Sequence, residues 1–582
     1  MPISDYNTSA ASNTVLGTIP IGPGMERNKV NDAIQQLMAD IAGAKLLEGT
    51  VNPQQYGAVG DGVANDATAL ASAIAAAQST GKTLDLGTAS YLCTTWTPIV
   101  TTATLRIIGN GATVRGPAST VLFLSPTTNF NIDGVTFDRW SGIVSRVLAE
   151  SGSFTDVRFT NNRVTNVTGI PINIEKPVSD YTITGNRFFN NTGGYQVRIG
   201  ENTFANQDTY TRGIISHNFF TSISATGTAS CAAILAYGRF ADVSHNTIEG
   251  MTQTGTGECW GIYTKVRYGR IIGNLVRSVL ASGNPDNVGI NIKGTTRAVT
   301  SSPQGFAVVC TGNIVRNVGV AGTSGAGIRA QTDDVLVYGN FIEDGGVFGM
   351  VADEASAYSN VRFLGNEVYF SSLVAGTNGF RIEGSGTNVG AENNTVVNAT
   401  GGCFLNAATA DLVDSYCKNN TFTGCTFPVI IDAASTRTLS RAVIDGNVMR
   451  SGTAAILNNG SAGTVSQLRL RNNDMSRCGT AVTGSLGTTP EISGNIGYLR
   501  GSAVFDPANL VDGAGVTTTV TVSGAVVGDM TRASFSLDLQ GILLTSWVSA
   551  ANTVSVRFQN ETGGAIDLAS GTIVAEAVRV IA

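Results

Sequence analysis

Two acidic residues, Asp353 and Glu383, each end a short apolar β-run, MVAD and FRIE, in a part of the chain where such runs recur. Hydrolysis of a glycosidic bond requires two carboxyl groups, one that donates a proton and one that acts as base or nucleophile. If the two runs are neighbouring strands, their Cβ atoms lie about 5 Å apart. That spacing is nearer to the carboxyl separation of retaining than of inverting glycosidases. With Glu354 beside them, Asp353 and Glu383 are therefore the predicted catalytic residues.

Aromatic and basic side chains occupy the equivalent places in neighbouring runs. Flat tyrosine rings and forked hydrogen-bond donors suit a sugar. The same mixture also fits an ordinary solvated sheet face. Neighbouring arginines would lower the pKa of a carboxylate, which counts against a general acid in this strip. The predicted substrate-binding residues are Tyr237, Tyr263, Lys265, Lys293, Arg329 and Arg381.

A second chemistry, β-elimination at a uronic acid, needs a cation against the sugar carboxylate and a base for the C5 proton. Lys265, Lys293 and Arg329 could supply the cation. A lysine or Tyr263 could act as the base if nearby cations lowered its pKa. A third alternative is that the chain binds a polysaccharide and cleaves nothing. Hydrolysis is preferred, and the groove could lie within one subunit or between two.

The composition excludes several classes of protein. A net charge of -6 argues against nucleic acid as a partner, because phosphate binding needs a basic surface. The chain has two His and eight Cys without a CxxC pair, so we expect neither a metal nor a cofactor, and we expect the cysteines to be buried. A membrane span would need about 18 consecutive apolar residues, and there is no such run. The N-terminus lacks the segments of a signal peptide, so synthesis in a reducing cytoplasm is expected.

A repeated unit organises the middle of the chain. Segments such as TGNIVRN, at 311–317, combine a turn pair with a short apolar run, and the Asn of the unit recurs mostly every 26 to 28 residues. A period of this length, with β-runs and no room for a helix, predicts a solenoid of stacked coils. We therefore expect a parallel β-helix with coils about 4.8 Å apart. The repeated Asn stands at 162, 186, 218, 246, 274, 313, 340, 366, 394, 420, 447, 473 and 495.

Side-chain alternation assigns residues to the two sides of the solenoid wall. Asn313 and Ile314 should lie on opposite sides, and the repeated Asn residues should hydrogen-bond from coil to coil. His217 and His245 each precede such an Asn and are interpreted as turn residues. Each unit has a second β-run after its turn, such as MVAD or FRIE. The second and fourth residues of this run should point outward and form rows from coil to coil.

The two ends of the chain differ from the repeat. Residues 47–500 are expected to form the β-helix with a capping loop and helix at its start. After 500 the period stops, and the alternating sequence of 501–582 predicts a β-sandwich-like antiparallel domain for trimerisation or receptor binding. Residues 1–46 contain an apolar seam that predicts an amphipathic helix, which could pack on its own domain, meet copies of itself or dock on a partner. The seam is formed by Val30, Ile34, Leu37 and Ile41.

The stretch YGAVGDGVANDATALASAIAAA, at 56–77, resembles the opening signature of the pectate-lyase-like β-helices of bacteriophage tailspikes. The resemblance implies structural roles for Gly60, Asp61, Gly62 and Asp66. IPIGPGMERNKVNDAIQQLMADIAG looks like the virion-anchoring start of such proteins, and VSAANTVSVRFQNETGGAIDLASGTI looks like a terminal domain of phage tail fibres and spikes. No motif in the chain matches a family pattern of catalytic residues.

Together these resemblances imply an all-β, right-handed parallel β-helix that assembles as a homotrimer on a phage tail. Its N-terminus would attach to a tail or baseplate adaptor. Its partner for host adhesion would be a bacterial capsular, exo- or lipopolysaccharide.

Overall fold

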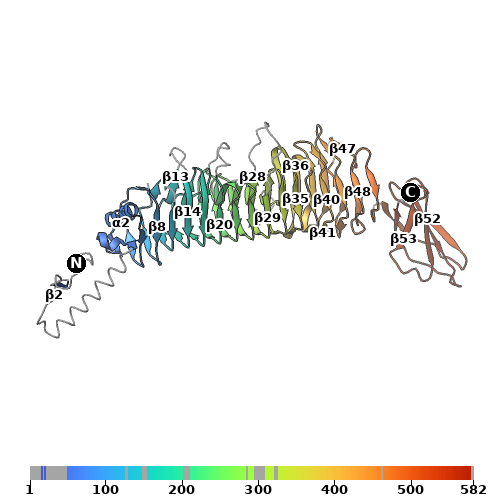
Figure 1. The fold of residues 1–582 in the computed structure, drawn as a ribbon. Helices are drawn as coiled ribbons and strands as arrows, with labels where there is room; N and C mark the ends of the chain where they lie inside the picture. Colours follow the sequence, from blue (N-terminus) through green and yellow to red (C-terminus); the bar gives the residue numbers. More distant parts are fainter. Residues whose placement is uncertain are drawn as a thin grey trace. The chain divides into compact units, whose positions relative to one another are not determined.

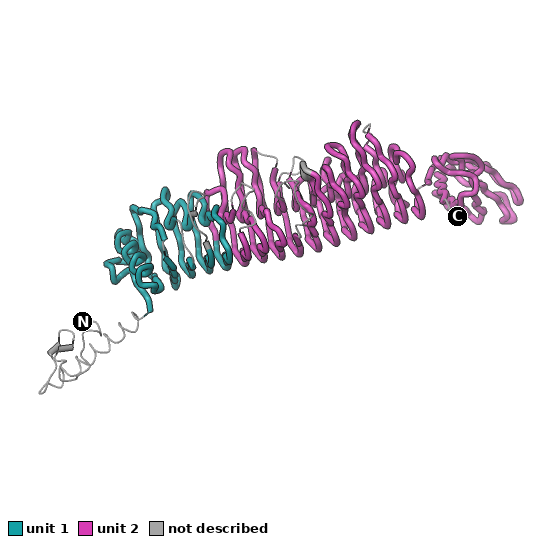
Figure 2. Tube along the Cα trace, turned by 45° about the horizontal axis from the view of Figure 1, so that its top comes forward, with its two compact units in different colours: residues 1–187 teal, residues 188–582 magenta. Residues whose placement is uncertain are grey.

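The structure of the chain is a computed structural model with two compact units, residues 1–187 and 188–582 (Figure 2). The helix expected within 1–46 lies outside the described residues, and the domain boundaries expected at 46 and 500 stay a prediction. No helix in the described part of the chain is long and apolar enough to cross a membrane. The structure describes residues 15–16, 19–20, 49–101, 103–124, 129–146, 154–200, 210–283, 286–293, 308–319, 325–459, 463–497 and 499–578.

In the first unit, the helix α2 (Ala67–Thr80) follows a tight loop. Asp66 precedes the helix, and its buried carboxylate accepts hydrogen bonds from the N–H groups of Val59 and Gly60, at 2.7 and 3.2 Å. Gly60 has a φ of 71°, in the left-handed region that favours glycine. These contacts agree with the structural roles that the sequence resemblance implies for Gly60 and Asp66.

Strands of the first unit stack in parallel behind this helix. Ile132 lies opposite Phe159 and Phe159 opposite Ile183, so one apolar row runs through three coils. All three side chains are buried, and this burial stabilises the stack because a single coil cannot cover its own apolar face. The three strands are β11 (Phe130–Asp133), β14 (Phe154–Thr160) and β17 (Val178–Thr184).

The second unit repeats a coil of three strands, and each strand pairs in parallel with its counterpart one coil later (Figure 1). The register is in phase: Ile248 lies opposite Val276, and Ile262 lies opposite Ile290. The predicted all-β fold with a parallel β-helix is therefore confirmed. One coil contains β23 (Asp242–Ser244), β24 (Thr247–Gln253) and β25 (Cys259–Arg267), and the next contains β26 (Arg270–Ile272), β27 (Leu275–Ala281) and β28 (Asn287–Lys293).

The repeated Asn residues form a buried ladder along this unit. The Nδ2 of Asn313 donates to the Oδ1 of Asn340 and to the carbonyl of Ile271, both at 2.9 Å. Its own Oδ1 accepts from the N–H and the side-chain amide of Asn274, both at 2.9 Å. Asn313 is fully buried and Ile314 is 39% exposed, so the two lie on opposite sides of the wall, as predicted.

The two histidines stand at exposed turns of this unit. The rings of His217 and His245 are stacked on neighbouring coils, with centroids 5.1 Å apart, and both residues have a φ of 55°. This placement agrees with their interpretation as turn residues.

Antiparallel strands follow the coils. They form two three-stranded sheets, ordered β51-β56-β53 and β52-β55-β54. Val520, Val554, Phe558 and Ile573 are fully buried and belong to one apolar cluster. This is the antiparallel β-structure expected near the C-terminus. The strands are β51 (Leu499–Phe505), β52 (Gly515–Thr521), β53 (Met530–Phe535), β54 (Leu543–Ala550), β55 (Thr553–Gln559) and β56 (Gly571–Val578).

Candidate functional site

The predicted site residues lie on one face of the second unit, where six strands pair in order. The register places Arg329, Val351 and Arg381 in one row and puts Asp353 opposite Glu383. The repeat thus brings the predicted residues together in rows, coil by coil. The strands are β22 (Cys231–Arg239), β25, β28, β31 (Ala326–Gln331), β34 (Phe348–Ser359) and β36 (Glu367–Thr387).

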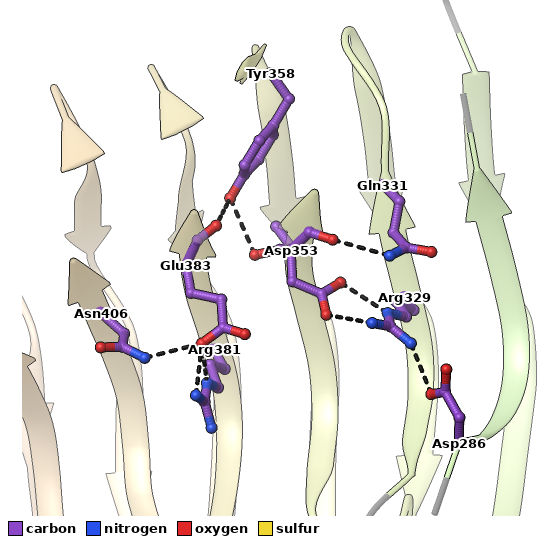
Figure 3. A network of polar contacts seen from close by, with 9 residues as sticks. Asp286, Arg329, Gln331, Asp353, Tyr358, Arg381, Glu383 and Asn406 are labelled. Atoms are coloured by element: carbon purple, nitrogen blue, oxygen red, sulfur yellow. Dashed lines mark hydrogen bonds and ion pairs between the residues drawn. The ribbon is translucent and has the colours of Figure 1, made fainter. Parts of the chain in front are cut away.

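Each carboxylate of the predicted catalytic pair is bound by an arginine (Figure 3). The carboxylate oxygens of Asp353 accept from Nε and Nη2 of Arg329, at 2.8 and 2.6 Å. Oε2 of Glu383 accepts from Nε of Arg381 at 2.7 Å and from Nδ2 of Asn406 at 2.8 Å. Each carboxylate thus already has a cationic partner.

Burial dominates the electrostatics of Asp353. It raises the pKa of this carboxyl to about 6, although Arg329 acts in the opposite direction, and the negative charges of Glu383 and Asp286 add to the increase. The side chain of Glu354, the third predicted catalytic residue, lies outside the part of the structure that is described.

A cavity of about 230 Å³ opens beside this network. Its aromatic wall is tightly packed: the ring centroids of Trp260 and Tyr263 are 4.4 Å apart, and those of Tyr237 and Tyr263 are 6.2 Å apart. Aromatic faces beside polar groups are a favourable surface for a sugar ring. The cavity is lined by Tyr195, Ser230, Leu235, Tyr237, Glu258, Trp260, Tyr263, Asp286, Asn291, Lys293, Arg329 and Gln331.

Two carboxyl groups meet at the wall of this cavity. Glu258 and Asp286 directly precede Cys259 and Asn287, which lie opposite each other on neighbouring strands. Burial raises the pKa of Glu258, and the charge of Asp286 and a hydrogen bond between the two carboxyl groups raise it further. Lys293 and Arg329 lower it by smaller amounts. Glu258 is therefore the carboxyl group of this pair whose protonated form is favoured.

Asp286 has a cationic partner of its own. Nη1 of Arg329 donates to Oδ1 of Asp286 at 2.7 Å, while the other side of the same guanidinium binds Asp353. The site thus pairs Glu258, a carboxyl group whose pKa is raised, with Asp286, a carboxylate that forms an ion pair with Arg329.

Three of the four predicted tyrosine and lysine ligands, Tyr237, Tyr263 and Lys293, line the same cavity. Tyr237, Tyr263 and Lys265 are buried, and Nζ of Lys265 lies 5.0 Å from the centroid of the Tyr237 ring. Burial raises the pKa of Tyr237, so its phenol is a poor base at neutral pH. Lys293 lines the cavity directly.

The rule of strict alternation missed Glu258 and Asp286. Trp260 and Tyr263 belong to one cluster outside the coil interior, although they are three residues apart. Gly261 between them faces inward, and a Cβ on it would lie 2.5 Å from Val276 and 2.6 Å from the carbonyl of Gly289. Glycine at this point shifts the alternation by one residue. The recurrence of Gly before an apolar residue, at 261, 289, 327, 349 and 379, is the sequence signal that could have revealed the shift.

The described side chains were compared with the ligand sets that hold metal ions in proteins. Among these residues, no group of three or more His, Cys, Asp or Glu side chains could hold a metal ion. The eight cysteines are buried as free thiols.

Comparison with known proteins shows likeness at the level of architecture. The chain matches no protein-family model and no curated protein. It is similar to the A-module of mannuronan C-5 epimerase AlgE6 from Azotobacter vinelandii, with 15% identity over 69% of this chain and 99% of that one and a TM-score of 0.42. It is also similar to a mutant tailspike protein of E. coli bacteriophage HK620 in complex with a hexasaccharide. That match has 12% identity, covers 92% of this chain and 94% of the other, and has a TM-score of 0.45.

Proposed function

We propose that the chain is a polysaccharide depolymerase that hydrolyses a glycosidic bond at the cavity. The observation that carries this proposal is the meeting of Glu258 and Asp286 on neighbouring coils, beside Trp260 and Tyr263. A polysaccharide offers flat sugar faces to the rings, and its glycosidic oxygen and anomeric carbon are the groups on which a carboxyl pair acts.

The environments of the two carboxyl groups assign their roles. Burial and the neighbouring carboxylate raise the pKa of Glu258, so this residue acts as the general acid. Asp286, bound to Arg329, acts as the nucleophile. A direct hydrogen bond between the two carboxyl groups fits the short separation of retaining enzymes better than the wider gap that admits water in inverting ones.

The reaction proceeds in two balanced steps. Glu258 donates its proton to the glycosidic oxygen as the bond from this oxygen to the anomeric carbon breaks, and an Asp286 oxygen bonds to that carbon. The Glu258 carboxylate then takes a proton from water, the water oxygen bonds to the anomeric carbon, and the bond to Asp286 breaks. Glu258 ends protonated again, and the polymer gains one reducing end.

We assign Asp353 and Glu383 to positioning within this proposal. Both carboxylate oxygens of Asp353 are held by Arg329, and Oε2 of Glu383 accepts from Arg381 and Asn406, so these carboxyl groups are occupied by partners within the protein. Asp353 instead fixes Arg329, which binds Asp286, and Glu383 fixes Arg381. The sugars are bound by residues that line the cavity and by two of their neighbours. The lining residues are Tyr237, Tyr263, Lys293 and Arg329, and the neighbours are Lys265 and Arg381.

The sequence resemblances at both ends support a biological setting for this reaction. We infer a homotrimeric tailspike on a phage virion, attached through its N-terminal segment to a tail or baseplate adaptor. Its ligand would be the capsular, exo- or lipopolysaccharide of the host, and its C-terminal region would serve trimerisation or receptor binding.

The test uses the purified surface polysaccharide of a bacterium that fluorescently labelled protein binds. Hydrolysis predicts new reducing ends without the ultraviolet absorbance of an unsaturated sugar, whereas β-elimination produces that absorbance and an adhesin leaves the polymer intact. We expect Glu258→Gln to lower kcat by roughly 10²- to 10⁴-fold, the usual contribution of a general acid. Glu249→Gln, on another face of the same coil, is the matched control.

Two positioning variants complete this test. Asp353→Asn and Glu383→Gln should lower kcat less than Glu258→Gln does. If Glu258→Gln keeps full activity while Asp353→Asn and Glu383→Gln abolish it, the reacting pair is Asp353 and Glu383 instead.

A further inference from the structure

Two aromatic rings form an exposed stack just beyond the ends of strands β22 and β25. The ring centroids of Phe240 and Tyr268 are 5.5 Å apart, and the ring planes are inclined by 18°. The side chains are 52% and 38% exposed. Single exposed aromatic residues are common on protein surfaces, whereas a stacked pair on neighbouring coils forms a flat apolar platform in contact with water.

The backbone beneath this platform is strained. Phe240 and Tyr268 have φ values of 57° and 52°, in a region that bulky side chains rarely occupy. At the same turn of other coils, the positive φ belongs to Asn and Asp residues, which tolerate it, and also to arginine and glutamine. These residues are Asp334, Asn360, Asn388 and Asp414, together with Arg212, Arg441 and Gln467. An aromatic residue at this position works against the stability of the turn, and strain of this kind is concentrated at functional sites.

An arginine that forms no ion pair with the described residues borders the platform. The guanidinium carbon of Arg239 lies 5.6 Å from the ring centroid of Phe240 and 5.8 Å from that of Tyr268. No carboxylate of the described residues forms an ion pair with Arg239, and its buried Nε has no hydrogen-bond partner. Arg267 lies directly opposite Arg239 on the neighbouring strand.

We propose that Arg239, Phe240 and Tyr268 form a subsite for an anionic sugar residue, so that the polysaccharide substrate is acidic. The rings would stack on the apolar face of the sugar. The guanidinium of Arg239 would bind the carboxylate, phosphate or sulfate group with charge-assisted hydrogen bonds.

This subsite deepens the proposed function and rests on it for the identity of the polymer. The strands that end at the platform begin at the cavity, because Glu258 directly precedes β25 and Tyr268 directly follows it. Tyr237 and Lys265 lie between the two ends. A strand of this length spans roughly 30 Å, so a chain of several sugars would occupy the cavity and the platform together.

The test uses four monosaccharides on one ring type: D-glucuronate, glucose 6-phosphate, glucose 6-sulfate and, as the neutral control, glucose. Saturation-transfer NMR with the full chain should show binding of one or more anionic sugars in preference to glucose, weakened by added salt. The anionic sugar that binds most tightly shows whether the subsite prefers a carboxylate, a phosphate or a sulfate group. Arg239→Gln should weaken its binding about tenfold, the loss expected for a charged hydrogen bond.

The aromatic residues are tested with Phe240→Asn and Tyr268→Asn. Each should weaken the binding of the same sugar by roughly fivefold. Neither substitution should lower the Tm, because Asn tolerates the positive φ at these positions. If Phe240 and Tyr268 served only to stabilise the fold, replacing them would lower the Tm. Tyr338→Asn and Arg316→Gln remove an exposed ring and an arginine elsewhere on the unit, and should leave binding unchanged.

Two outcomes would overturn this inference: no preference for any anionic sugar over glucose, or full affinity in Arg239→Gln. Failure of the proposed function is a separate result, because the monosaccharide experiment needs no cleavage. In the polymer assay, subsite variants should raise KM and leave kcat near the wild-type value, while Glu258→Gln lowers kcat.

Discussion

Arg329 holds Asp353 at two points, with Nε and Nη2 donating to the two carboxylate oxygens at 2.8 and 2.6 Å (Figure 3). Its remaining nitrogen, Nη1, binds Asp286 on the neighbouring coil. The guanidinium is thereby fixed between three successive coils and cannot turn toward a different partner without breaking a charged contact. Arg329 thus connects Asp353, a predicted catalytic residue, to Asp286 at the wall of the cavity.

The first prediction concerns the pH dependence of stability. The pKa of Asp353 is about 6 in the folded chain and 3.8 in the reference state, so the folded state binds the extra proton. Its contribution to stability is complete below about pH 4 and is lost as the pH rises through 6. The loss is worth up to about 3 kcal/mol. The Tm of wild type minus the Tm of Asp353→Asn should therefore increase as the pH is lowered from 7 to 4.5. A difference that stays constant over this range would contradict the prediction.

The second prediction concerns stereochemistry. Glu258 and Asp286 stand next to each other on neighbouring coils, which is nearer to the short carboxyl separation of retaining enzymes than to the wider gap that admits water. The hydrolysis should therefore proceed with retention at the anomeric carbon. Proton NMR of the first products, recorded before mutarotation, reports their configuration. Inversion would show that the reacting pair is more widely spaced than Glu258 and Asp286.

The third prediction concerns the pH profile of cleavage. Activity requires Glu258 to be protonated, so kcat/KM should fall on the alkaline side as the pH rises through the raised pKa of this residue. Lys293 lowers that pKa. Lys293→Gln should consequently move the alkaline limb to higher pH, whatever it does to the maximal rate. Lys418→Gln removes a lysine from another face and should leave the limb in place; an unchanged limb in Lys293→Gln would exclude Glu258 as the acid.

Much of the fold follows from one residue type in a fixed period. The recurrence of Asn predicted both the solenoid and the ladder, because a buried amide that bonds to its own copy one coil away forces the coils into register. The same repeat predicts that Asp353 lies opposite Glu383, and the strand pairing has this register. Rows of this kind are predictable because they depend only on which residues share a position in the repeat.

The chemistry within a row is less predictable. Alternation could not indicate that Arg329 turns toward Asp286 and Asp353, since its long side chain reaches either neighbour. The acid pair of the cavity was missed for a different reason. Gly261 shifts the alternation of side chains by one residue, so Glu258 and Trp260 lie on the same side as Tyr263 against the expected pattern. The shift arises because Gly261 packs closely against the next coil, and the sequence around it does not show this contact.

The last prediction tests the Asn ladder itself. Asn313→Ala removes five side-chain hydrogen bonds in the interior, one of them to the sulfur of Cys310, and leaves the carbonyl of Ile271 and the amide of Asn274 without these partners. An unsatisfied buried polar group costs about 1–3 kcal/mol, so a substantial fall in Tm is expected. Because each coil contacts only its neighbours, hydrogen exchange should accelerate most in the coils that contain Asn274 and Asn340. Ile314→Ala changes the adjacent residue on the outer side of the wall and should have a small effect. Equal destabilisation by the two variants would mean that packing, and not the ladder, sets the stability of this turn.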